Sequence, residues 1–470
     1  MAAGHNGVVE VRYCEGWDPG ARAAIAPLAE AEARRRDASG EPYAVLLSSG
    51  GAPRALFQVD WGRAFLSYFL FDERARRTSR YEYRQLEPGR LHLRCYRQWH
   101  QTSPTEPEFP ERGRRFTLTV HPGGGARREL EAAGSLRMGA EVPAEHRTVA
   151  KAGFGAWTAY LDPRVLRPDA ADGPVTPVPA PDPAPEERAG PAPESGWSAP
   201  VPLRPRHLEA LFTPGSRFTS SRDKTAVITE PVPAGLLRLP TGSVTAVDPG
   251  TADDRDQPFT VTVEPGEYPV LIASMRWEGE EWEGETPAAM LRIRDRPTAT
   301  WELALRQGQD ARLLDDGEFF GFGVDTGTGC FVDAAGRDGL AKRCEEWMTN
   351  HGFRGTDGEE AAYTEIPDPG SGAHAIAYLS GMGDGSYPVW IGRDGEGEVT
   401  CFVADMLVLH HAEPQPPVVE PAAFRPPPVP AWADDRREAP FTDPRATAEF
   451  IAAQLADVAD FMAERRGGGG

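Results

Sequence analysis

Short runs of β-forming residues, separated by turn residues, dominate the first third of the chain. Six of them follow one another between residues 42 and 120: PYAVLLSS, RALFQVD, AFLSYFLFD, SRYEYRQL, RLHLRCYRQW and RRFTLTV. Several of these runs alternate apolar and polar positions. In one of them Leu91, Leu93 and Cys95 alternate with His92, Arg94 and Tyr96, which is typical of a sheet with one solvated face. Turn pairs such as Pro88-Gly89 suit tight hairpins. The pattern therefore predicts an antiparallel meander sheet.

One helix is predicted before these strands. Residues 20–36, GARAAIAPLAEAEARRR, read as an amphipathic helix that ends in a basic cluster. Arginines in the last turn complement the helix dipole, so the cluster has a structural explanation. A helix followed by a meander predicts a small α+β domain over residues 1–165.

Proline-rich segments divide the rest of the chain. Residues 166–205 contain many prolines and few large apolar side chains, so they are predicted to form a semi-extended linker. A second proline-rich strip covers residues 412–440. Residues 206–411 between the two segments form the second predicted domain.

The last part of the chain is predicted to be helical. Over residues 441–466, Ile451, Leu455 and Val458 recur at helical spacing, which predicts an amphipathic helix that docks on the chain's own domains. Residues 467–470, GGGG, are predicted to be a disordered tail.

The second domain is also rich in predicted strands. Runs such as FTVTV, YPVLIAS, FFGFGV, HAIAYLS and YPVWIG are bounded by Gly, Asp and Pro, and LAKRCEEWMTN is the one convincing helix. We therefore predict a β-rich α+β protein, with a sandwich or barrel-like second domain.

A chain of motifs over residues 236–411 resembles a known family. In order they are LPTGSVTAVDP, VEPGEYPVLIA, RWEGEEW, TWELAL, DDGEFFGFGVDTGTGCFVD and GDGSYPVWIGRDGEGEVTCFVADMLVL. Together they resemble domain-of-unknown-function family 4241, an uncharacterised bacterial family. The resemblance does not extend to the N-terminal domain. It implies no activity and transfers no catalytic residue.

Charge and cysteine content narrow the classes of partner. The formal net charge is −21, while residues 1–165 hold 24 Lys and Arg against 20 Asp and Glu, so the remainder carries −25. Such an acidic surface repels nucleic acid and anionic membranes, and no apolar run approaches the ~20 residues that span a bilayer. Five scattered cysteines fit reduced thiols, which predicts a cytoplasmic protein.

The sequence Asp325-Thr326-Gly327 raises two catalytic possibilities. Aspartic proteases carry such a loop, but two aspartates must share one proton there, and the nearest second loop, Asp248-Pro249-Gly250, has proline where a hydroxyl residue belongs. A sugar-kinase phosphate loop needs a large fold downstream, and too little chain follows. We therefore interpret the segment as a β-hairpin in which Asp325 and Thr326 cap the turn.

Aspartates near strand ends are the remaining chemical candidates. Carboxylates gathered at one end of a sheet bind hard divalent cations such as Ca²⁺ or Mg²⁺, although Asp beside Gly more often serves turn geometry. No other cofactor is predicted. The candidate catalytic residues are Asp248, Asp325, Asp333 and Asp405, and the candidate metal ligands are Asp325, Asp333, Asp384 and Asp405.

Two hypotheses of function follow. The favoured one is a non-enzymatic protein-interaction protein, immunity-like in that an acidic surface masks a partner, with a protein partner and neither nucleic acid nor membrane. The alternative is a hydrolase or a metal- or ligand-binding enzyme that uses an aspartate cluster around Asp325. It requires these carboxylates to converge in a cleft with raised pKa values.

Overall fold

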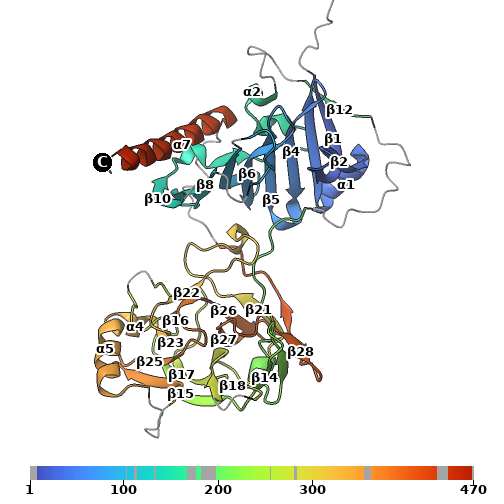
Figure 1. Ribbon diagram of the computed structural model, residues 1–470. Coiled ribbons are helices and arrows are strands. Elements are labelled where there is room, and N and C mark those ends of the chain that lie inside the picture. Colours follow the sequence, from blue (N-terminus) through green and yellow to red (C-terminus); the bar gives the residue numbers. More distant parts are fainter. Residues whose placement is uncertain are drawn as a thin grey trace, which may run out of the picture. The chain divides into compact units, whose positions relative to one another are not determined.

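The chain folds as two compact units (Figure 1). Unit 1 comprises residues 1–200 and 432–470, and unit 2 comprises residues 201–431. The computed structural model describes residues 8–467 except 102, 111–113, 132–133, 167–175, 182–196, 254–255, 280–282, 354–360 and 431–442. The predicted disordered tail, residues 467–470, lies almost wholly outside this described part.

Unit 1 is built on one sheet, to which twelve strands of the described residues contribute. From β3 to β10 each strand pairs antiparallel with the next, and β1 and β12 continue the sheet beyond β3. This confirms the predicted meander. The strands are β1 (Val8–Asp18), β2 (Ala23–Leu28), β3 (Tyr43–Ser49), β4 (Ala52–Asp60), β5 (Phe65–Phe71), β6 (Arg77–Glu87), β7 (Arg90–His100), β8 (Arg114–Val120), β9 (Gly125–Glu131), β10 (Ser135–Glu141), β11 (Thr148–Ala150) and β12 (Thr176–Pro179).

The N-terminal helix is displaced from its predicted position. Residues 20–36 do not form one helix, because β2 occupies their middle and pairs with β1, and helix α1 covers Glu30–Ser39. Pro27 explains the error, since proline lacks the N–H that a helix interior needs, whereas it is tolerated on an edge strand such as β2.

Part of the predicted linker joins the sheet of unit 1. Within residues 166–205, strand β12 pairs parallel with β1, with Val8 opposite Thr176. Its two prolines, Pro177 and Pro179, sit on a strand at the sheet edge, where a missing N–H costs little.

Helix α7 (Pro444–Gly467) is the amphipathic helix predicted for residues 441–466. Ile451 and Val458 are buried in the same apolar cluster as the inner face of the meander, and Phe450 stacks on His146. The helix therefore docks on unit 1 by the apolar positions that the sequence spacing identified.

Unit 2 contains three sheets in the residues described. An eight-stranded and a four-stranded sheet enclose a cluster that includes Phe331, Tyr378 and Phe402, and a five-stranded sheet covers the other face of the larger one. This confirms a sandwich, and the sheets do not close into a barrel. The strands are β13 (Arg217–Thr219), β14 (Thr225–Ile228), β15 (Val232–Leu239), β16 (Val244–Val247), β17 (Gly266–Ile272), β18 (Met275–Trp277), β19 (Glu283–Glu285), β20 (Ala288–Arg292), β21 (Thr300–Leu303), β22 (Gly321–Val324), β23 (Thr328–Asp333), β24 (Tyr363–Pro367), β25 (His374–Leu379), β26 (Gly385–Arg393), β27 (Val399–Asp405), β28 (Glu413–Gln415) and β29 (Ala423–Phe424).

Helix α5 (Leu340–Asn350), as predicted from LAKRCEEWMTN, covers the outer face of the four-stranded sheet. It buries Leu340 and Cys344 against Val332, Ala375 and Ala377. The outer layer of unit 2 at the four-stranded sheet is therefore helix α5, and the candidate site lies beside this helix.

The second proline-rich strip is anchored on unit 2 as far as Arg425. Strand β29 pairs with β21, and Arg425 forms an ion pair with buried Glu302, at 3.0 Å between Nε and Oε2. Phe424 packs edge-on against Trp390. These contacts hold the first part of the proline-rich strip against unit 2, although the strip has too few large apolar side chains to fold alone.

Candidate functional site

The segment Asp325-Thr326-Gly327 is a crossover between two sheets. Strand β22 before it pairs with β26 in the larger sheet, and β23 after it pairs with β16 and β25 in the four-stranded sheet. The predicted hairpin is therefore wrong, because β22 and β23 are not partners. Alternating apolar residues made both segments strands, but alternation does not specify which strands pair.

Asp248 organises this crossover. Its carboxylate is buried and accepts hydrogen bonds from the amides of Gly250, Asp325 and Thr326, each at 2.8 Å, and from the Thr326 hydroxyl at 2.7 Å. Val247 pairs with Cys330 at the end of β16, which brings Asp248 beside the turn. The capping carboxylate is thus Asp248, and Asp325, predicted to cap the turn, is exposed.

Asp333 performs a similar structural task at the other end of β23. It is fully buried, and its carboxylate accepts hydrogen bonds from the Thr241 amide and hydroxyl and from the amide of Ala335. It caps the short helix α4 (Ala334–Arg337). Two of these bonds join the end of β23 to the turn at Thr241, and the third caps α4.

Asp325 and Asp384 lie at the end of the ladder between β22 and β26. The last pair between β22 and β26 is Val324 with Gly385, so Asp325 and Asp384 occupy the next antiparallel positions, and both are exposed. Asp405 lies elsewhere, buried at the end of β27. In the described ranges, no group of three or more His, Cys, Asp or Glu side chains is arranged to hold a metal ion.

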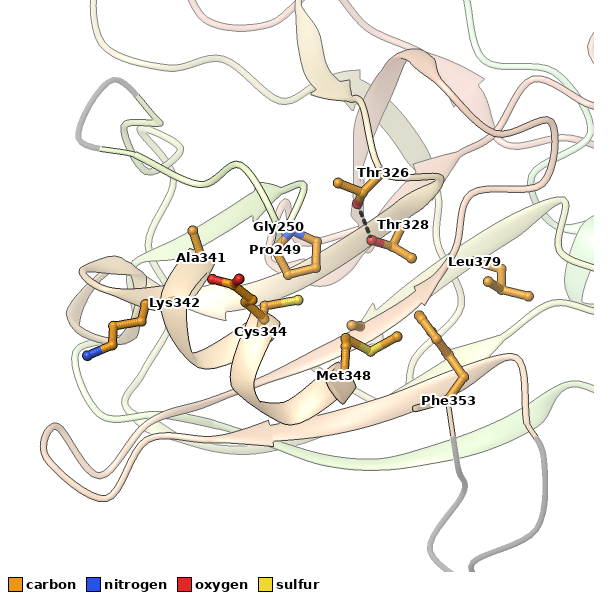
Figure 2. Close-up of a pocket in the computed structure, with 12 residues that line it drawn as sticks. Pro249, Gly250, Thr326, Thr328, Ala341, Lys342, Cys344, Met348, Phe353 and Leu379 are labelled. Carbon is orange, nitrogen blue, oxygen red and sulfur yellow. Dashed lines mark hydrogen bonds between the residues drawn. The ribbon is translucent and has the colours of Figure 1, made fainter. Parts of the chain in front are cut away.

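A pocket of about 580 Å³ opens beside the crossover (Figure 2). Helix α5 supplies Cys344 and Met348, β25 supplies Leu379, and Phe353 closes another side. Thr326 and Thr328 line the polar edge, joined by a hydrogen bond of 2.7 Å between their hydroxyls. Its size lies in the ~300–1,000 Å³ range of ligand pockets, and a mostly apolar wall with few polar groups is their usual composition.

The hydroxyl protons at the polar edge have a fixed order. Asp248 receives four donors, so the Thr326 hydroxyl donates its single proton to that carboxylate. The Thr328 hydroxyl must then be the donor in the bond between the two threonines. The Thr328 oxygen consequently keeps free lone-pair capacity, and the pocket presents a hydrogen-bond acceptor.

Two of the motifs quoted for the family resemblance, LPTGSVTAVDP and DDGEFFGFGVDTGTGCFVD, contribute residues to the pocket lining. Residues 237–404 match the DUF4241 family model, described as a protein of unknown function. The match confirms the resemblance and does not extend to unit 1. No curated protein and no solved structure matches the chain.

The DUF4241 region contains the whole of the lining described above. Sequence reasoning pointed to Asp325 but missed Thr328, Met348 and Leu379. One signal was available: Cys344 and Met348 are four residues apart on one helix face. Thr326 and Thr328 come together through the bend at Gly327, which residue spacing does not reveal. In the part of the chain that can be described, no helix is long and apolar enough to cross a bilayer.

The pocket thiol in the DUF4241 region is not an activated nucleophile. Burial raises the pKa of Cys344 to about 11, so the thiol stays protonated near neutral pH. Lys342 also lines the pocket, but its amine points outward in Figure 2, and its Nζ lies 3.7 Å from the Glu346 carboxylate. The walls of the pocket therefore bind by packing and hydrogen bonding.

Asp405 is expected to make the stability of unit 2 decrease as pH rises from about 4 to about 7, with little further change above that. Burial raises the pKa of Asp405 to about 7, so the folded state keeps the proton where the unfolded chain has lost it. A raised folded pKa gives stability that is lost as pH rises through 7, by roughly 3 kcal/mol between pH 5 and pH 9. Urea unfolding of Asp405→Asn should lack this loss. An equal decrease in the variant and the parent would contradict it.

Proposed function

We propose that the chain is a non-enzymatic protein-binding protein whose unit 2 binds a basic protein partner. The observation that carries this proposal is charge: residues 201–431 hold 37 Asp and Glu against 19 Lys and Arg, a formal net charge of −18. A surplus of one sign on a folded unit attracts partners of the opposite sign and accelerates their association.

Internal pairing of the arginines strengthens this argument. Arg393 and Arg425 both bind the buried carboxylate of Glu302, and Arg312 binds buried Asp310. Further arginines of unit 2 pair with carboxylates on its surface. Since these cations are already engaged, the surplus carboxylates determine the field that a partner meets.

The hydrogen bonding of the aspartates favours this function over the enzymatic alternative. Both oxygens of Asp248 already accept two hydrogen bonds each, which suits a structural anchor more than a proton-sharing pair with Asp325. The most specific version of this proposal is an immunity-type role, in which the acidic surface of unit 2 covers a basic site on a toxin. The five buried free thiols support a cytoplasmic setting.

Cross-linking in the native host, with the full chain as bait, tests the proposal. Partners identified by mass spectrometry should be basic, and a purified partner should bind about tenfold or more weakly at 300 mM than at 50 mM salt, because salt screens charge attraction. An acidic partner, or an affinity that salt leaves unchanged, would contradict the charge-based proposal. A chain with the exposed pair Arg12 and Glu10 both replaced by Gln keeps its net charge and serves as control.

A further inference from the structure

We infer that the pocket beside the crossover receives an apolar side chain from an extended segment of the basic partner, while an adjacent Arg or Lys of that segment pairs with Asp325 and Asp384. This inference rests on the proposed function and names the surface that performs it. Below, "docking surface" means the pocket together with Leu379, Met382, Asp325 and Asp384.

The first support is a pair of exposed apolar side chains, one in the pocket wall and the other three residues further along the chain. Met382 is 73% exposed and Leu379 is 38% exposed, and Leu379 also lines the pocket. The Ser380 amide donates to the Gly327 carbonyl at 3.0 Å, which holds this loop beside the crossover turn. Exposed apolar side chains around a pocket are typical of protein-binding surfaces, and methionine adapts well to a partner.

The second support is charge complementarity at the rim of the pocket. Exposed Asp325 and Asp384 lie at the end of the ladder between β22 and β26, and Thr326, the residue after Asp325, lines the pocket. Two exposed carboxylates at the end of one strand ladder offer acceptors to a guanidinium or ammonium group, and charge-assisted hydrogen bonds of this kind are strong. The lining also contains exposed Glu345 and exposed Lys342, whose charges are opposite, so the surplus negative charge at the rim comes from Asp325 and Asp384.

The third support is the acceptor at Thr328. Because its proton goes to Thr326, its oxygen can accept a hydrogen bond from the backbone N–H of a segment that enters the pocket. An extended segment presents a side chain and backbone N–H groups together. The polar edge and the apolar wall thus match two features of one ligand.

A direct binding test uses fluorescent heptapeptides, Gly-Gly-Arg-X-Arg-Gly-Gly, titrated against the full chain. With X as Leu, Met or Phe, binding should be at least about tenfold tighter than with X as Gly, and replacing both arginines by Glu should abolish it. Equal binding of the Gly peptide would overturn the pocket, and equal binding of the Glu peptide would overturn the charge contact. Tighter binding of hexylamine than of any peptide would overturn the inference in favour of a small-amine site.

Variants locate the effect. Ala341→Phe fills the pocket from helix α5, and Leu379→Ala removes part of its wall. The double variant Asp325→Asn, Asp384→Asn removes the two carboxylates and should leave thermal unfolding unchanged. Each of the three should weaken binding of the peptide with X as Leu about tenfold or more. Asp295→Asn, at a side chain 95% exposed elsewhere in unit 2, is the matched control and should bind normally.

The same variants separate this inference from the proposed function. If the cross-linked partner binds every variant as tightly as the parent chain, the docking surface is wrong while the protein-binding function stands. If no basic partner is captured and the parent chain binds none of the peptides, both are overturned.

Discussion

Replacement of Asp248 by alanine is expected to lower the free energy of unfolding of unit 2 by about 3–5 kcal/mol, and Asp325→Ala by less than about 0.5 kcal/mol. The Asp248 carboxylate accepts three amides and one hydroxyl. Its removal takes the buried acceptor away from four donors, and a hydrogen bond to a charged group contributes about 1.5–3 kcal/mol. The Asp325 side chain is exposed, so its loss removes no packing.

Hydrogen exchange in the full chain, followed by mass spectrometry across a urea series, measures this difference within unit 2. Peptides that contain residues 325 and 326 should lose protection in Asp248→Ala and retain it in Asp325→Ala, while peptides from unit 1 remain unchanged as an internal control. Equal effects of the two substitutions would show that Asp325, not Asp248, holds the turn.

The positions of the strands could be predicted from the sequence better than the pairing between them. Alternation of apolar residues located the meander of unit 1 and the strands of unit 2, because burial of one face depends on local spacing. It could not reveal that β22 and β23 join different sheets, since pairing depends on contacts distant in sequence. The misplaced N-terminal helix is different, because Pro27 is a local signal in the sequence that opposes a continuous helix over residues 20–36.

The candidate site was predicted in part for the same reason. A conspicuous tripeptide drew attention to Asp325, but the functional geometry depends on Asp248, 77 residues earlier, whose side chain reaches the turn through strand pairing. The pocket wall from helix α5 and β25 is likewise a product of tertiary packing. The chemical groups that a residue offers can be predicted from the sequence, whereas the residues that meet at one site are known only from the folded structure.

Substitution of Gly242 by alanine is expected to destabilise unit 2 by more than about 4 kcal/mol, enough to leave much of it unfolded. Gly242 has φ +73°, a left-handed conformation, and an added Cβ would overlap the carbonyl oxygen of Val263. The turn cannot move aside easily, because the Gly242 carbonyl accepts the Val263 amide at 2.9 Å and Asp333 holds the preceding Thr241.

Gly327→Ala is the matched control for this prediction. Gly327 in the crossover turn has a similar φ of +69°, but an added Cβ would meet no atom within 4 Å. Its substitution should cost only the conformational penalty of about 1–2 kcal/mol for a left-handed alanine. Thermal unfolding of the full chain, with exchange in unit 2 as the local measurement, should therefore separate the two variants by more than about 2 kcal/mol. Equal destabilisation would mean that backbone conformation alone, and not the close approach of Val263, makes glycine necessary at position 242.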